Sequence, residues 1–152
     1  MAKPTEAQLA KINRFTKTPL DADSVHVHSF RLLGTGFIPS RFLQFDASLM
    51  DKYLANINNG DVVQIADHSF GGYGDNVTLP FGRFFEGELV SDADKLQLDG
   101  SMFMPKACKT YIGDFTTDDI SQQIDAGILH DSSVSVTWGF SECSICHNDI
   151  RD

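Results

Sequence analysis

The stretch that decides the fold spans residues 124–146 and reads IDAGILHDSSVSVTWGFSECSIC. Its first part is typical of a helix end, because Gly127 readily takes the left-handed conformation that closes a helix. The part that follows alternates hydroxyl and apolar side chains with a period of two, which predicts a half-buried strand. The hydroxyl positions, all on one face of this strand, are Ser133, Ser135 and Thr137. The stretch therefore predicts a helix, a strand with a polar face, and then a Cys-x-x-Cys pair.

Composition indicates one soluble domain. The 152 residues, 41% of them hydrophobic, are enough for a single core. The formal net charge of −9 argues against a nucleic-acid partner, because phosphate binding needs a basic surface. No apolar run approaches the roughly 20 residues of a membrane helix, and the polar N-terminus is unlike a secretion signal. We expect an intracellular protein that binds neither nucleic acid nor a membrane.

Helix signals occur at three places. Thr5 begins a capping box, Asp46 can cap a helix that continues through Asn58, and Thr116 opens a third helix that Gly127 ends. Each signal combines a side chain that accepts from the first free backbone N–H groups with an apolar stripe behind it. The sequence therefore predicts three helices, of which the first can be a docked helix or a flexible arm.

Alternation of apolar and polar residues predicts strands at four further places, residues 21–33, 61–66, 81–90 and 96–104. The last two form a hairpin joined by residues 91–94, and the strand at 61–66 is expected to be buried. Hairpins without regular crossovers favour the α+β class, with a mostly antiparallel, barrel-like sheet and a few flanking helices. We divide the chain into an N-terminal arm or helix (1–18), a single domain (19–142) and the start of a Cys-x-x-Cys tail that the sequence cuts short (143–152).

A serine on the strand at 133–138 is a candidate nucleophile. A serine hydroxyl is a weak nucleophile at neutral pH, so it needs an imidazole within hydrogen-bond reach. The candidate base is His68, which with Asp67 follows the strand at 61–66 and enters a glycine-rich loop. Ser133 and Ser135 point the same way, so spacing does not choose between them. The commoner alternative is that these serines pack on a strand face and that His68 caps a turn.

Cysteines and histidines offer two metal hypotheses. Three cysteines are too few, and odd in number, for a secreted disulfide framework. Cys143 and Cys146 with His147 make half a zinc site, but zinc takes four ligands and no second pair is recognisable. His26 and His28 share one strand face and could chelate a metal, although a solvated strand face is the commoner explanation. We therefore assign no metal to this chain.

Four segments occur in a characteristic order: NRFT at 13–16 with the strand at 25–30, IADH at 65–68, LPFGRFF at 79–85 and IDAGILHDSSV at 124–134. Together they resemble the prohead (capsid maturation) proteases of tailed bacteriophages, serine proteases similar in fold to the herpesvirus assemblins. In that family the histidine of the second segment is the catalytic base and the serine of the fourth is the nucleophile. The match from Gly127 to Cys143 needs no gap and assigns the family serine to Ser133, with Ser135 as the fallback.

The resemblance implies that residues 19–142 are an assemblin-like protease domain. The protein would be an endopeptidase that acts in the host cytoplasm, inside the immature phage capsid, on the scaffold and major capsid proteins and on itself. It would self-associate and need no cofactor. The third catalytic residue is unassigned, and the candidates by residue type are His28, His130, Asp131 and Glu142.

An alternative reading belongs to a different functional class. In it the same fold is a non-catalytic module associated with capsid assembly or scaffold, Ser133 only packs, and the Cys-x-x-Cys end is a metal-braced docking element. Substituting Ser133 and Ser135 separately discriminates between the two readings.

Overall fold

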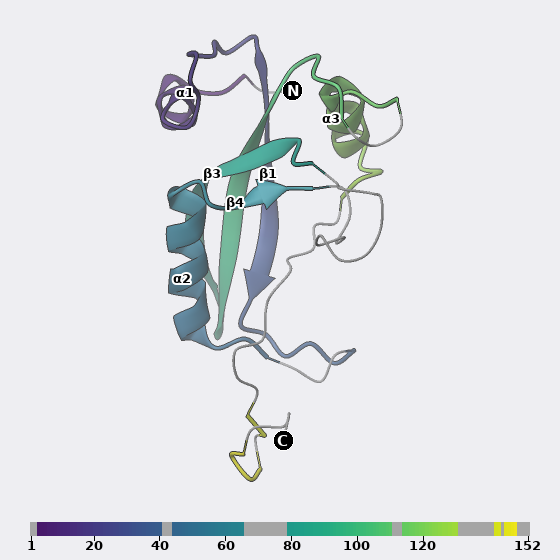
Figure 1. Ribbon diagram of the computed structural model, residues 1–152. Helices are drawn as coiled ribbons and strands as arrows, with labels where there is room; N and C mark the ends of the chain where they lie inside the picture. The colour runs from purple at the N-terminus through teal and green to yellow at the C-terminus, as the bar shows by residue number, and fades with distance from the viewer. Residues whose placement is uncertain are drawn as a thin grey trace.

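The computed structural model describes residues 3–40, 44–65, 79–110, 114–130, 142–143 and 145–148 (Figure 1). Its elements in chain order are α1 (Glu6–Asn13), β1 (Val25–Gly34), α2 (Ala47–Asn58), β2 (Val63–Gln64), β3 (Gly82–Asp92), β4 (Lys95–Pro105) and α3 (Thr117–Asp125). The described part of the protein is thus α+β, with a curled antiparallel half-barrel sheet of four strands and three helices.

The sheet has the strand order β1-β4-β3-β2, and every pairing is antiparallel. The predicted hairpin is confirmed as β3 and β4, but its turn is tighter than expected. Asp92 still pairs with Lys95, so only Ala93 and Asp94 connect the strands, and Ala93 takes a left-handed conformation with φ 55°. Such two-residue turns suit the right-handed twist of paired strands.

The main core lies between the sheet and two helices. α2 and α3 cover the face that carries Met102 and Met104 of β4, and they contribute Ile57 and Ile120 to the same cluster. Gly100 allows close packing at the centre of this face, because a Cβ there would lie 2.7 Å from the Leu32 side chain. Large apolar side chains on both layers exclude water and provide the main stabilisation.

The opposite face of the sheet is covered by α1. Ile12 of this helix is completely buried against Val25, Phe85 and Phe103. The Thr5 capping box forms as predicted, and the first helix is therefore a docked helix rather than a flexible arm. Figure 1 shows α1 and α3 on either side of the sheet, at the end where β1 begins.

The strand expected at residues 61–66 is much shorter than its apolar run suggested. β2 contains only Val63 and Gln64, which pair with the first two residues of β3. The expectation that it is buried was wrong: Val63 is 40% exposed, because β2 lies at the edge of the sheet. Another apolar residue of the run, Val62, packs against the main core from just outside the strand.

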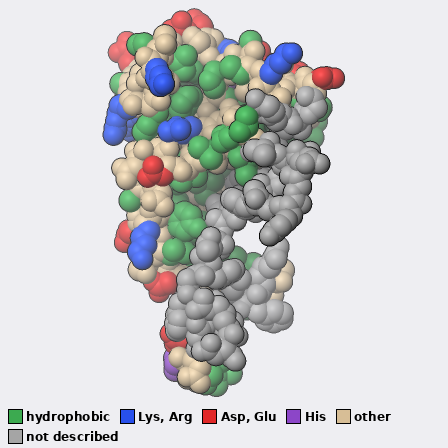
Figure 2. All heavy atoms as spheres, in the orientation of Figure 1, with side chains coloured by type: hydrophobic (Ala, Val, Ile, Leu, Met, Phe, Trp, Pro, Cys, Tyr) green, Lys and Arg blue, Asp and Glu red, His purple; other side chains and the backbone are tan. Residues whose placement is uncertain are grey.

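The described surface mixes hydrophobic, basic and acidic side chains (Figure 2). No helix among the described residues is long and apolar enough to span a membrane.

Candidate functional site

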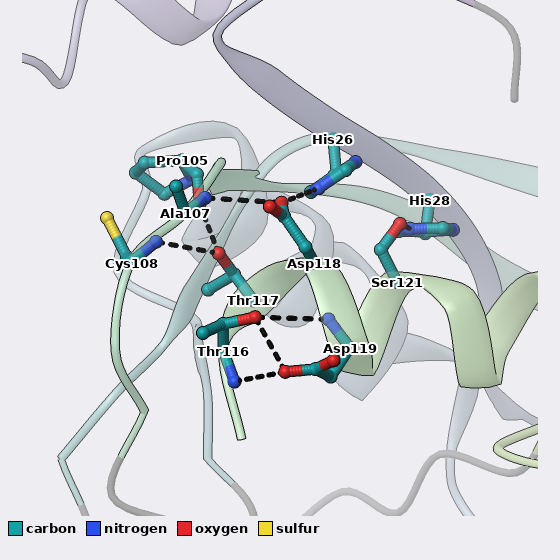
Figure 3. A network of polar contacts seen from close by, with 10 residues as sticks. All are labelled: His26, His28, Pro105, Ala107, Cys108, Thr116, Thr117, Asp118, Asp119 and Ser121. Carbon is teal, nitrogen blue, oxygen red and sulfur yellow. Dashed lines mark hydrogen bonds and ion pairs between the residues drawn. The ribbon is translucent and has the colours of Figure 1, made fainter. Parts of the chain in front are cut away.

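The most densely connected polar group of described residues lies between β1 and α3 (Figure 3). His26 and His28 occupy alternate positions of β1, so both side chains leave the same face of the sheet. That face is covered by α3, and the two histidines are only 5% and 8% exposed. The expectation that this strand face is solvated was therefore wrong, because a helix roughly 90 residues later in the chain packs over it.

His26 is bonded to a carboxylate at the start of α3. Its Nε2 lies 2.5 Å from Oδ1 of Asp118, and the same oxygen accepts the Ala107 backbone N–H at 3.2 Å. An ionised carboxylate only accepts, so Nε2 of His26 carries the hydrogen. The hydrogen bond from His26, followed by that from Ala107, lowers the pKa of Asp118 below its ordinary value of 3.8. Asp118 is therefore a charged link between β1, α3 and the end of β4.

His28 is bonded one turn further along α3. Its Nε2 lies 2.8 Å from Oγ of Ser121, and its Nδ1 lies 3.9 Å from Oδ1 of Asp125. Burial lowers the pKa of His28. The nearby Asp125 opposes this shift, whereas His26 adds to it. Serine, histidine and aspartate here have the connectivity of a catalytic triad, but Ser121 is 0% exposed. A hydroxyl that no substrate can approach is a structural partner, so these contacts hold α3 on the sheet.

The beginning of α3 is also bonded to the end of β4. Thr116 caps the helix in a capping box with Asp119, as the sequence predicted. Thr117 donates from Oγ1 to the Pro105 carbonyl at 2.6 Å and accepts the Cys108 N–H at 3.2 Å. Figure 3 shows these contacts continuing directly into the His26 and His28 contacts. The helix is therefore held along its whole length before the chain continues past it.

The partners of the two histidines were missed from the sequence. Asp118, Ser121 and Asp125 fall at i, i+3 and i+7, which is one face of a helix. Two histidines at i and i+2 of a strand are about 7 Å apart, and one helical turn rises about 5.4 Å, so the spacings are compatible. That polar stripe was the available signal, although nothing local shows that it faces β1.

The Cys-x-x-Cys pair lies in a closed turn. The Cys143 N–H donates to the Asn148 carbonyl at 2.9 Å, and the His147 N–H donates to the Cys143 carbonyl at 2.8 Å. His147 reverses the chain in a left-handed conformation with φ 59°. The backbone N–H groups of Cys146 and Ile145, and then the Cys146 thiol, donate to the Cys143 sulfur and lower its pKa. The turn thus brings two thiols together and favours the thiolate form of one.

Side chains at the base of this turn are also paired. His147 contacts Glu142 through Nδ1, and all three cysteines are free thiols. Within the described ranges no group of three or more histidine, cysteine or acidic residues is placed to hold a metal ion. The two hypothetical metal sites are therefore not complete within the described part of one chain.

The sequence-predicted catalytic residues lie in other parts of the chain. Ser133, Ser135 and His68 fall outside the described residues, as does Asp131. Two further candidates for the third catalytic residue are committed to the contacts given above, His28 to α3 and Glu142 to His147. The fourth, His130, is exposed and follows the end of α3.

The chain was compared with protein families, curated proteins and solved structures. No family model, no curated protein and no solved structure matches it.

Proposed function

We propose that this protein is a prohead maturation protease of the assemblin-like type, a serine endopeptidase in which Ser133 is the nucleophile and His68 the base. The observation that carries the proposal is the order of the four sequence segments described above. The α+β half-barrel is compatible with an assemblin-like domain, and the closer identity is part of the proposal.

The arrangement of the sheet supports the proposal. One row of paired residues crosses all four strands in the order β1, β4, β3 and β2, and consists of Val27, Phe103, Arg83 and Val63. β2 therefore ends at the end of the sheet where α3 covers β1. The segment with His68 follows β2, and the segment with Ser133 follows α3. Both segments thus begin at the same end of the curled sheet. The two edge strands, β1 and β2, are separated by three strand spacings, which is about 14 Å measured across the sheet.

α3 is a rigid starting point for the nucleophile segment. The helix ends at Gly127, which has φ 70°, and the Ile128 N–H donates back to the Gln123 carbonyl at 3.0 Å. The contacts to His26 and His28 fix the helix on the sheet. A nucleophile must be held precisely relative to its base, so a firmly anchored helix that ends eight residues before Ser133 fits the proposed role.

The chemistry follows from these two side chains. The Ser133 hydroxyl attacks the scissile carbonyl carbon while His68 takes its proton, and backbone N–H groups stabilise the oxyanion. His68 then gives that proton to the leaving amine, the C–N bond breaks, and an acyl-serine remains. Water attacks the acyl group with His68 again as the base, which releases the carboxyl product and restores the serine. No cofactor takes part in this sequence.

The proposed substrates are the phage scaffold and major capsid proteins and the protease itself, cleaved inside the immature capsid in the host cytoplasm. The test is co-expression with a capsid precursor. Ser133→Ala and His68→Ala should each reduce cleavage by a factor of about 10³ or more, and Ser135→Ala should retain it. If Ser135→Ala abolishes cleavage and Ser133→Ala does not, the assigned nucleophile is wrong.

A second candidate function is favoured by the Cys143–Cys146 turn, whose facing thiols suit a metal-braced docking element. In that case the protein is a non-catalytic module of capsid assembly with the same fold. It predicts that Ser133→Ala, His68→Ala and Ser135→Ala all leave processing of the precursor unchanged, whereas Cys143→Ser weakens association with its assembly partner.

A further inference from the structure

α3 is attached to the sheet differently from the other two helices. The side chains that α1 and α2 bury are apolar, namely Ile12, Met50 and Ile57. α3 buries three side chains, of which Ile120 is apolar, whereas Thr117 and Ser121 are polar. A buried polar contact is stabilising only while each partner has the matching charge and hydrogen. The attachment of α3 therefore depends on the protonation state of the side chains beneath it.

Two histidines lie beneath α3, and they meet different partners (Figure 3). His26 faces the ionised carboxylate of Asp118 at 2.5 Å, so a proton on this imidazole completes an ion pair. His28 faces the neutral Ser121 hydroxyl at 2.8 Å, and the Asp125 carboxylate is 3.9 Å away, beyond hydrogen-bond distance. A proton on His28 is therefore a buried charge that Asp125 compensates only in part.

The other groups around His28 disfavour its charged form. His26, whose ring centroid lies 6.4 Å away, and the positive amino terminus of the chain both oppose a second positive charge. On the neighbouring strand β4, the apolar Met102 pairs with His28. Burial has the largest effect and lowers the pKa of His28 against the weaker influence of Asp125. The neutral imidazole is thus the form that suits the closed helix.

We propose that His28 is an acid-sensitive latch: the neutral imidazole holds α3 on β1, and its protonation releases the helix from a sheet that stays folded. Release exposes Ile120 but keeps the apolar contacts of the sheet with Met50 and Ile57 of α2. Local opening therefore costs less free energy than unfolding of the chain. Because the chain continues from α3 at Gly127, the latch also determines where the next segment starts. The inference does not depend on the proposed protease activity.

Hydrogen exchange of the full-length chain, measured from about pH 7.5 to about pH 5 and corrected for intrinsic rates, tests the latch. Protection of the α3 amides should fall below about pH 6.5, by up to about tenfold for each pH unit, because the open form takes up the proton first. Amides of β4 should remain more protected by a factor of roughly 100 or more, since they exchange only when the sheet opens. Equal protection of α3 and β4 would overturn the latch, because the helix would then open only with the whole chain.

Three variants identify the titrating group. His28→Gln keeps a polar side chain that cannot be charged, so it should remove the fall in α3 protection. His26→Gln weakens a different contact of the helix and should retain the fall. Asp125→Asn removes the carboxylate that favours the charged imidazole, so the fall should continue to lower pH.

A fall that persists in His28→Gln would overturn the assignment of the latch to His28. Should that variant not fold, the other two decide. Loss of the fall in His26→Gln, or an unchanged pH range in Asp125→Asn, would equally overturn it.

Discussion

Removal of one buried hydroxyl should measure how strongly α3 is held on the sheet. Ser121→Ala deletes the oxygen that lies 2.8 Å from Nε2 of His28, at a position with 0% exposure. Ser29→Ala deletes an oxygen that lies 2.8 Å from its partner, Oγ of Ser101, but at an exposed site. The two substitutions remove the same atom at the same distance, so they differ mainly in burial.

The expected magnitudes differ for a physical reason. A buried polar group that loses its partner costs about 1–3 kcal/mol, because no water replaces the lost bond. Alanine is the better helix former by about 0.5 kcal/mol, so the net loss for Ser121→Ala is about 0.5–2.5 kcal/mol. For a chain of this length that corresponds to a fall in Tm of about 1–10 °C. Ser29→Ala should change the free energy of unfolding by less than about 0.5 kcal/mol, because water bonds to Ser101 instead.

The assay is urea denaturation at pH 7.5, followed by circular dichroism, on the two variants and the parent chain. His28→Leu alone and the double variant Ser121→Ala with His28→Leu are measured as well, and the double variant replaces both partners by apolar groups. It should lose less stability than the two single changes added together, because neither polar group is then left buried alone. The reasoning is refuted if Ser29→Ala destabilises the protein as much as Ser121→Ala, or if the double variant shows simple additivity.

Three further measurements probe the same region and the core. Burial lowers the pKa of His28 below its ordinary 6.5, so as the pH falls the imidazole is protonated in the unfolded chain before it is protonated in the folded one. The free energy of unfolding should therefore fall as the pH drops below about 6.5. His28→Gln should flatten this part of the stability profile, measured by denaturation at each pH. Gly100→Ala would place a Cβ 2.7 Å from the Leu32 side chain and should cost about 1–3 kcal/mol, whereas Gly34→Ala, with its nearest neighbour at 3.6 Å, should cost less than half of that in the same denaturation assay. Thr116→Ala removes the cap of α3 and should cost about 1 kcal/mol in thermal unfolding, while Thr116→Ser, which keeps the hydroxyl, should cost only a few tenths.

Local signals predicted the helices well. The capping boxes that begin with Thr5 and Thr116, the cap at Asp46 and the left-handed Gly127 all occur as predicted. Each of these features depends on side chains and backbone groups within about four residues, so the sequence contains the whole interaction. The β3–β4 hairpin was predicted for the same reason, since its partners are neighbours in the chain.

Burial was predicted less well, because it depends on what packs over a segment. The apolar run around Val63 suggested a buried strand, but β2 pairs with only two residues of β3 and lies at an edge. His26 and His28 alternate with valines and therefore suggested a solvated face. In both cases the predicted strand was confirmed, but the prediction of whether one of its faces is buried or exposed was wrong.

The sequence by itself determined the α+β class, the ends of the helices and the hairpin, because these follow from periodicity and from bonds between near neighbours. It also supplied the order of segments on which the proposed protease function rests. Only the tertiary structure decided that α3 covers the two histidines and that Asp118 and Ser121 are their partners. Those contacts join residues more than 90 positions apart, and a pattern within either segment carries no information about which distant surface will bury it.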